Sequence, residues 1–152
     1  MHLSDHLTLA EFTHSDTAQR LGINNDLPHS LVEQAKRTGA LLERIRAELS
    51  VQAGREVPIL VSSGFRCTTL NAAIGSSATS DHVQALALDF RAPAFGSPLA
   101  ICQALQPGLE RLGIGQIIFE HTWVHVSTRA PANPVNRVLT LTGKNYLPGI
   151  VA

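Results

Sequence analysis

The sequence predicts an α+β fold in which a small antiparallel sheet bears the functional site and is flanked by helices. The chain has 152 residues, a length that fits one domain, so we assign residues 1–152 to a single domain. Residues 28–49 carry apolar side chains at helical spacing, whereas the second half alternates short apolar runs with Gly and Ser turns. One long helix and several short strands are therefore expected.

The N-terminal part of the chain is expected to be helical. Thr8 and Ser15 precede short apolar clusters and can cap one or two short helices. In the segment 28–49 the apolar residues fall on one face, interrupted only by Thr38, and Pro28 suits a first helical turn. We expect this amphipathic helix to pack on the sheet.

The rest of the chain is expected to supply the sheet. The run 85–90 is apolar on both faces apart from Asp89, which is typical of a strand that is buried on both sides. Short helices are predicted over residues 71–74 and 97–105. The predicted strands are residues 59–61, 85–90, 116–119, 122–126 and 137–141.

Composition excludes several classes of function. Twelve basic residues balance twelve acidic ones, so there is no net field to attract nucleic acid. The apolar stretches are shorter than the roughly 20 residues of a transmembrane helix, so no membrane insertion is expected. The first residues lack the pattern of a signal peptide. Cys67 and Cys102 stand in unrelated contexts, and we expect two free thiols.

Three polar side chains occupy positions where the local pattern calls for apolar ones. Asp89 interrupts an apolar strand, and a carboxylate buried there requires a cation or a metal ion as partner. His82 stands at the mouth of the same strand, and His125 lies within the predicted strand 122–126. If the two strands are neighbours, two imidazoles and one carboxylate can meet.

This set of ligands is typical of catalytic zinc, because a structural zinc site fills all four positions with protein side chains. Zn²⁺ activates water and polarises a carbonyl group, so the set indicates hydrolysis. Glu120 and His121 come shortly before His125, and either residue could act as the general base.

Three ordered blocks of the sequence match a known pattern: Ser63-Gly64-Phe65-Arg66-Cys67 with Leu70-Asn71, then Ser80-Asp81-His82 with Ala87 and Asp89, then Trp123-Val124-His125. In these blocks the sequence resembles the M15 metallopeptidases, a family that includes D-alanyl-D-alanine carboxypeptidases and phage endolysins. The flanking helix and the leading segment 3–12 are also similar to the small phage-type branch, so the resemblance covers most of the chain.

The resemblance implies a role for each matching residue. His82, Asp89 and His125 would bind Zn²⁺, and Arg66 and Ser80 would line the substrate cleft. It also implies a fold like that of the DD-peptidases and Hedgehog domains, and a peptidoglycan peptide as substrate. We expect a monomer, encoded by a phage and acting on the cell wall after synthesis in the host cytoplasm.

The sequence departs from the family pattern at two positions. Ala85 stands where the family commonly has glycine, and we expect an extended backbone there that tolerates the methyl group. Several members place the catalytic acid three residues before the last histidine, where this chain has Thr122; Glu120 stands five residues before it. A small loop could still direct Glu120 to the metal site, with His121 as the alternative base.

Other functions stay open at this stage. The displaced acid motivates a non-catalytic wall-binding or virion structural module that retains the fold. A closed cleft would favour a peptidase that acts on free D-alanyl-D-alanine. The sequence does not choose between an endopeptidase and a carboxypeptidase.

Overall fold

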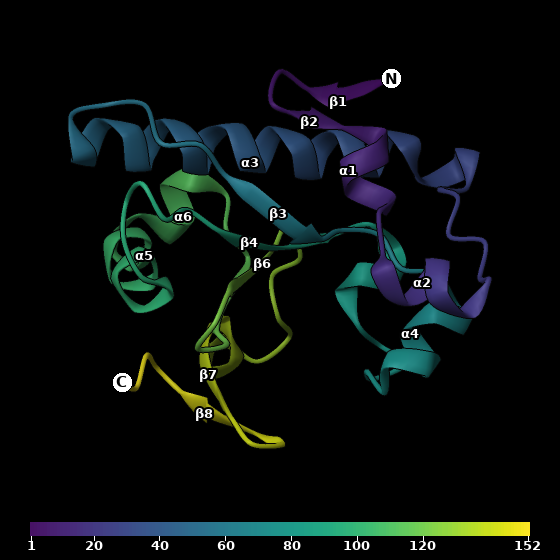
Figure 1. Ribbon diagram of the computed structural model, residues 1–152. Coiled ribbons are helices and arrows are strands. Elements are labelled where there is room, and N and C mark those ends of the chain that lie inside the picture. The colour runs from purple at the N-terminus through teal and green to yellow at the C-terminus, as the bar shows by residue number, and fades with distance from the viewer.

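A six-stranded sheet crosses the protein in the computed structural model, which describes residues 1–152, and the long helix α3 runs along one side of it (Figure 1). The strand order is β3-β4-β6-β5-β7-β8. The bounds are β3 Leu60–Ser63, β4 Ala87–Arg91, β5 Gln116–Phe119, β6 Val124–Ser127, β7 Val138–Thr142 and β8 Asn145–Pro148.

The sheet is mixed, which corrects the expectation of a purely antiparallel one. Strand β7 pairs with β5 in parallel, and all other neighbours are antiparallel. The chain leaves β6, passes through the short 3-10 helix Pro134–Arg137, and returns on the far side of β5. Because β6 is antiparallel to β5, a strand that returns there runs parallel to β5. The α+β class is confirmed.

Helix α3 (Val32–Ala53) confirms the predicted amphipathic helix, with its bounds shifted by four residues at each end. Pro28 precedes a 3-10 turn instead of lying in the helix itself. The helix ends at Gly54, whose φ of 69° places it in the left-handed region that glycine adopts without strain. Thr38 is buried, and its hydroxyl donates a 2.7 Å hydrogen bond to the Ala85 carbonyl.

Where β4 and β6 pair, the sheet has one apolar face and one polar face. Leu88 and Phe90 on β4 and their neighbours Val126 and Val124 on β6 are fully buried in the core, which also contains residues of α3 and of α5 (Pro98–Leu105). Because side chains alternate along a strand, Asp89 and His125 must point to the opposite face. The functional site is on that second face.

Two short helices near the N-terminus confirm the predicted caps. Thr8 caps α1 (Leu9–Thr13) in a capping box with Glu11, and Ser15 caps α2 (Asp16–Leu21). A small hairpin of β1 (His2–Ser4) and β2 (Leu7–Thr8), which the sequence did not predict, lies against α3, where Ser4 donates a hydrogen bond to Glu43.

The remaining short helices connect the strands. Predicted helices 71–74 and 97–105 correspond to α4 (Thr68–Ile74) and α5, the latter capped by Ser97. The others are 3-10 helix Asp81–Gln84, 3-10 helix Gln106–Gly108 and α6 (Leu109–Leu112).

Cys67 and Cys102 are free thiols, as expected. None of the helices combines the length and the apolar character that a bilayer crossing requires.

Candidate active site

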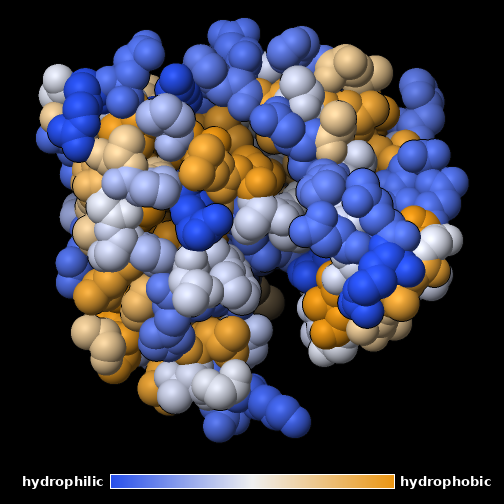
Figure 2. Space-filling model, in the orientation of Figure 1, coloured by the Kyte–Doolittle hydropathy of each residue, from blue (hydrophilic) through white to orange (hydrophobic).

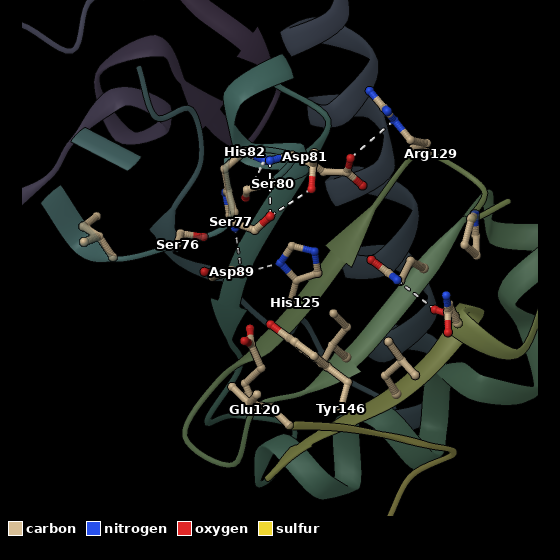
Figure 3. Close-up of a pocket in the computed structure, with 18 of the residues that line it drawn as sticks. Ser76, Ser77, Ser80, Asp81, His82, Asp89, Glu120, His125, Arg129 and Tyr146 are labelled. Carbon is tan, nitrogen blue, oxygen red and sulfur yellow. Dashed lines mark hydrogen bonds and ion pairs between the residues drawn. The ribbon is translucent and has the colours of Figure 1, made fainter. Parts of the chain in front are cut away.

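The side chains of His82, Asp89 and His125 meet on the polar face of the sheet, as the sequence predicted (Figure 3). One potential ligand atom from each residue lies within 4.8 Å of the other two. All three residues are buried. They come from the 3-10 helix Asp81–Gln84, from β4 and from β6.

Strand register brings two of these three side chains together. Asp89 on β4 pairs directly with His125 on β6, and the flanking residues place their apolar side chains in the core. His125 Nδ1 lies 2.9 Å from Asp89 Oδ1, and His82 Nε2 lies 3.2 Å from the same oxygen. Both imidazoles are therefore directed at a single carboxylate oxygen.

A backbone carbonyl fixes the ring of His82. Its Nδ1 lies 2.6 Å from the Gly64 oxygen, and because a carbonyl only accepts, Nδ1 must carry the proton. Gly64 packs so closely on Phe12 that an added Cβ would lie 2.5 Å from that side chain. Only glycine allows this approach, which explains the glycine of the Ser63-Gly64-Phe65 block.

The turn that carries His82 ends in a strained conformation. Ala85 has a φ of 58°, so the expectation of an extended backbone at this residue is wrong. Its N–H and that of Leu86 bond back to the His82 and Asp81 carbonyls, a helix end for which glycine is preferred. The Ala85 methyl is completely buried in the core, and its contacts offset part of the backbone strain.

The charges in this cluster favour a cation at its centre. Burial opposes the ionisation of Asp89, but the two histidines hold its pKa well below the usual range. Burial lowers the pKa of His82, so its ring tends to be neutral, with the Nε2 lone pair facing a carboxylate oxygen. Two electron-rich atoms at 3.2 Å need a proton or a metal ion between them. Two imidazoles and one carboxylate fit Zn²⁺.

Glu120 lies beside this cluster and lines the same cleft (Figure 3). It directly follows β5, and its N–H bonds to the Trp123 carbonyl across the turn. Trp123 Nε1 donates a 2.7 Å hydrogen bond to Glu120 Oε2, which leaves Oε1 without a protein partner. Burial and the charge of Asp89 raise the pKa of Glu120.

His121 does not join the other predicted site residues. It occupies the left-handed region with a φ of 65°, and its ring is exposed and packs on Phe119. Its Nε2 donates a 2.7 Å hydrogen bond to the Leu141 carbonyl on β7. It is not among the residues that line the cleft.

Arg66 and Ser80 both line the cleft, as expected. The Arg66 Nη2 to Ser80 Oγ distance is 3.4 Å, and the Arg66 N–H bonds to the His82 carbonyl. The Nε of Arg66 is buried and has no hydrogen-bond partner. Asn25 anchors this segment through bonds to the Phe65 carbonyl and the Cys67 N–H.

Asp81, Arg129 and Tyr146 also line the cleft but were not predicted. Asp81 accepts a 2.6 Å bond from buried Ser127 and lies 3.3 Å from Arg129 Nε. Asp81 stood inside a recognised block, so its position was a usable signal. Arg129 and Tyr146 come from residues beyond the three blocks and carried no sequence signal.

The cleft opens on the surface between the C-terminal hairpin and the side of the molecule formed by α2 and α4 (Figure 2). Its volume is about 1040 Å³. Small polar residues line the wall next to the 3-10 helix Asp81–Gln84, and His82, Asp89 and His125 line the same cleft. The wall residues on that side are Gly75, Ser76, Ser77, Thr79 and Ser80.

A family model described as Peptidase M15 matches residues 5–127. The chain belongs to the Peptidase M15 family. The matched segment contains all the residues named in the description of this site except Arg129, Leu141 and Tyr146. M15 proteins are metallopeptidases, and the His82, Asp89 and His125 group of this M15 member can hold a metal ion. A search of curated proteins found no match.

Proposed function

We propose that this protein is a zinc peptidase that hydrolyses peptide bonds of bacterial peptidoglycan. The observation that supports it best is the group of His82, Asp89 and His125 on the floor of an open cleft, with Glu120 beside it. Two imidazoles and one carboxylate leave a coordination position free for water or substrate, as in catalytic zinc sites. When bound, Zn²⁺ lowers the pKa of water and polarises a carbonyl group.

Glu120 is the proposed general base. The Trp123 indole holds one carboxylate oxygen, so Oε1 is available to take a proton from the attacking water. Its raised pKa allows the carboxyl group to keep that proton briefly and to pass it to the leaving amine. His121 is bound to the β7 backbone and is the weaker candidate.

Arg66 and Ser80 are proposed to position the peptide. The Arg66 side chain is half-buried, and its buried Nε lacks a protein partner. A carbonyl or carboxylate oxygen of a bound peptide would satisfy this donor, and the Ser80 hydroxyl lies next to it.

Two features support a wall peptide as substrate. One side of the cleft consists of glycine, serine and threonine residues. These small residues leave room for a peptide with small side chains, such as the alanine residues of peptidoglycan. Its volume of about 1040 Å³ lies just above the roughly 300–1,000 Å³ found for small-molecule sites, which favours a longer peptide over a free dipeptide. The resemblance to the phage-type branch supports a phage-encoded enzyme that acts on the wall.

The test combines zinc content with lysis of isolated peptidoglycan, before and after chelation and zinc addition. About one zinc per chain and chelator-sensitive loss of turbidity are expected. His82→Ala should abolish both, whereas His14→Ala, an exposed histidine outside the site, should change neither. A protein that binds zinc but cleaves no cell-wall peptide would favour the non-catalytic wall-binding module. Absence of zinc from the wild-type protein would refute the proposal.

A further inference from the structure

The C-terminal hairpin of β7 and β8 forms one side of the cleft. The family match ends at Ser127, yet Leu139, Leu141 and Tyr146 of this hairpin line the cleft together with the metal ligands. The segment after residue 127 therefore supplies part of the cleft lining that the matched segment does not.

Strand register shows that these residues share the face of the metal ligands. Asp89 pairs with His125, His125 with Ile118, and Ile118 with Leu139, so one row crosses four strands from the metal site to the hairpin. Leu141 lies two residues further along β7 on the same face, and its partner on β8 is Tyr146. The hairpin therefore extends the sheet face that carries His125 and Asp89 by two strands.

Tyr146 has no structural role that would explain its position. All residues of β8 are exposed, and 53% of Tyr146 is accessible, so the ring does not anchor the hairpin in the core. Its hydroxyl makes no hydrogen bond within the protein, although it points into the cleft toward Glu120 and His125 (Figure 3). An exposed aromatic ring with a free donor at the rim of a cleft is a typical ligand contact.

The two sides of the cleft differ in chemistry. Opposite the hairpin, Ser77 and Ser80 offer small hydroxyls. On the hairpin side, two leucines offer an aliphatic surface. Burial and the charge of Glu120 raise the pKa of Tyr146, so its hydroxyl stays protonated and can donate.

We propose that Tyr146, Leu139 and Leu141 form a substrate subsite beside the metal centre. An aliphatic side chain of the peptide packs on the two leucines, while the Tyr146 hydroxyl donates a hydrogen bond to a backbone carbonyl oxygen of the peptide. This assignment rests on the proposed peptidase function. It makes Tyr146 a substrate-binding residue that determines which peptide segment is held on this side of the cleft.

The test compares Tyr146→Phe and Tyr146→Ala with Asn145→Ala, a neighbour on β8 whose side chain points to the opposite face. The substrate is a synthetic peptidoglycan pentapeptide ending in D-Ala-D-Ala. Tyr146→Phe loses one hydrogen bond, which should lower kcat/KM about tenfold, mainly through a higher KM. Tyr146→Ala also loses the ring, which should lower kcat/KM about 100-fold. Asn145→Ala should stay within about twofold, and zinc content should not change in any variant.

A second measurement does not depend on turnover. Calorimetry should show that the zinc-free protein binds the pentapeptide and that Tyr146→Ala weakens binding about tenfold or more. Wild-type cleavage with both Tyr146 variants matching Asn145→Ala would overturn the subsite and leave the peptidase assignment intact. A zinc-loaded wild-type protein that neither cleaves nor binds the pentapeptide would overturn both.

Discussion

Asp89 and His125 face each other across β4 and β6, with His125 Nδ1 2.9 Å from Asp89 Oδ1. Their neighbours Leu88, Phe90, Val124 and Val126 are all buried on the other face of the sheet. The same alternation that builds the core thus directs both polar side chains into the cleft, and a one-residue slip between the strands would separate the pair.

Asp89→Asn should remove zinc and activity together. The amide keeps the size of the side chain but loses the charge that two imidazoles and a metal ion require. Replacing residues that merely touch a metal ligand already costs about 10- to 100-fold, so loss of a ligand should exceed 100-fold in kcat/KM. Metal analysis and peptide cleavage measure the effect, with exposed Asp26→Asn as the control. Full zinc content in Asp89→Asn would show that this carboxylate is not a ligand.

Glu120→Gln should lower kcat by about 10²- to 10⁴-fold while zinc content stays unchanged. Glutamine can still accept the hydrogen bond of Trp123 through its carbonyl oxygen, but it cannot take a proton from water. His121→Ala should leave kcat within about twofold, because this ring is bound to β7 outside the cleft. The reverse pattern in the two variants would identify His121 as the base.

The stability of the zinc-free protein should depend on pH through Glu120. Burial and Asp89 raise its pKa in the folded state above the unfolded value, so the folded protein takes up the proton first. The ionised group therefore destabilises the fold at neutral pH, and this cost disappears as pH falls through the folded pKa toward the unfolded one. Glu120→Gln should melt at a higher temperature than wild type at pH 7.

Thermal melts from pH 7 to about pH 4 test this expectation, and the two Tm values should converge at the acid end. The control is Glu110→Gln, which removes an exposed carboxylate far from the cleft. A Glu120→Gln variant that melts below wild type at pH 7, with a gap that closes as the pH falls, would show that the pKa of Glu120 is lowered instead.

Ala85→Gly should change the free energy of unfolding by less than about 1 kcal/mol. Relief of the left-handed backbone favours glycine by roughly 1 kcal/mol, but the lost buried methyl costs about 0.8 kcal/mol and the unfolded chain gains freedom. Ala87→Gly loses a buried methyl on β4 without this relief and should destabilise by about 1–2 kcal/mol. Urea denaturation of the two variants measures the difference, and equal losses would mean that Ala85 is unstrained.

The sequence predicted the metal group because its signal is local. A lone acid within an apolar strand, and a histidine in the strand Val124–Ser127, are anomalies that alternation alone places on the polar face. No local sequence pattern decides between Glu120 and His121 as the general base. It depends on the tight turn that pairs Glu120 with Trp123 and puts His121 in a left-handed conformation.

The parts that were missed have weak patterns. Strand β8 is exposed at every position, so it has no apolar alternation to detect, and β1 and β2 are too short to show a period. The parallel pairing of β5 with β7 depends on where the chain returns after β6, which no single segment encodes. The contribution of Tyr146 to the cleft follows from these two features and was therefore not foreseen.

Gly64 links the amino-terminal segment to His82, the first of the proposed metal ligands. Phe12 packs against the α-carbon of Gly64, and the Gly64 carbonyl accepts a hydrogen bond from the His82 ring. Docking of the first thirteen residues and occupation of the metal site are thus thermodynamically coupled, so each should strengthen the other. Zinc should protect this segment from proteolysis. A fusion or deletion in the segment should weaken the metal affinity of a site that is more than fifty residues away in the chain.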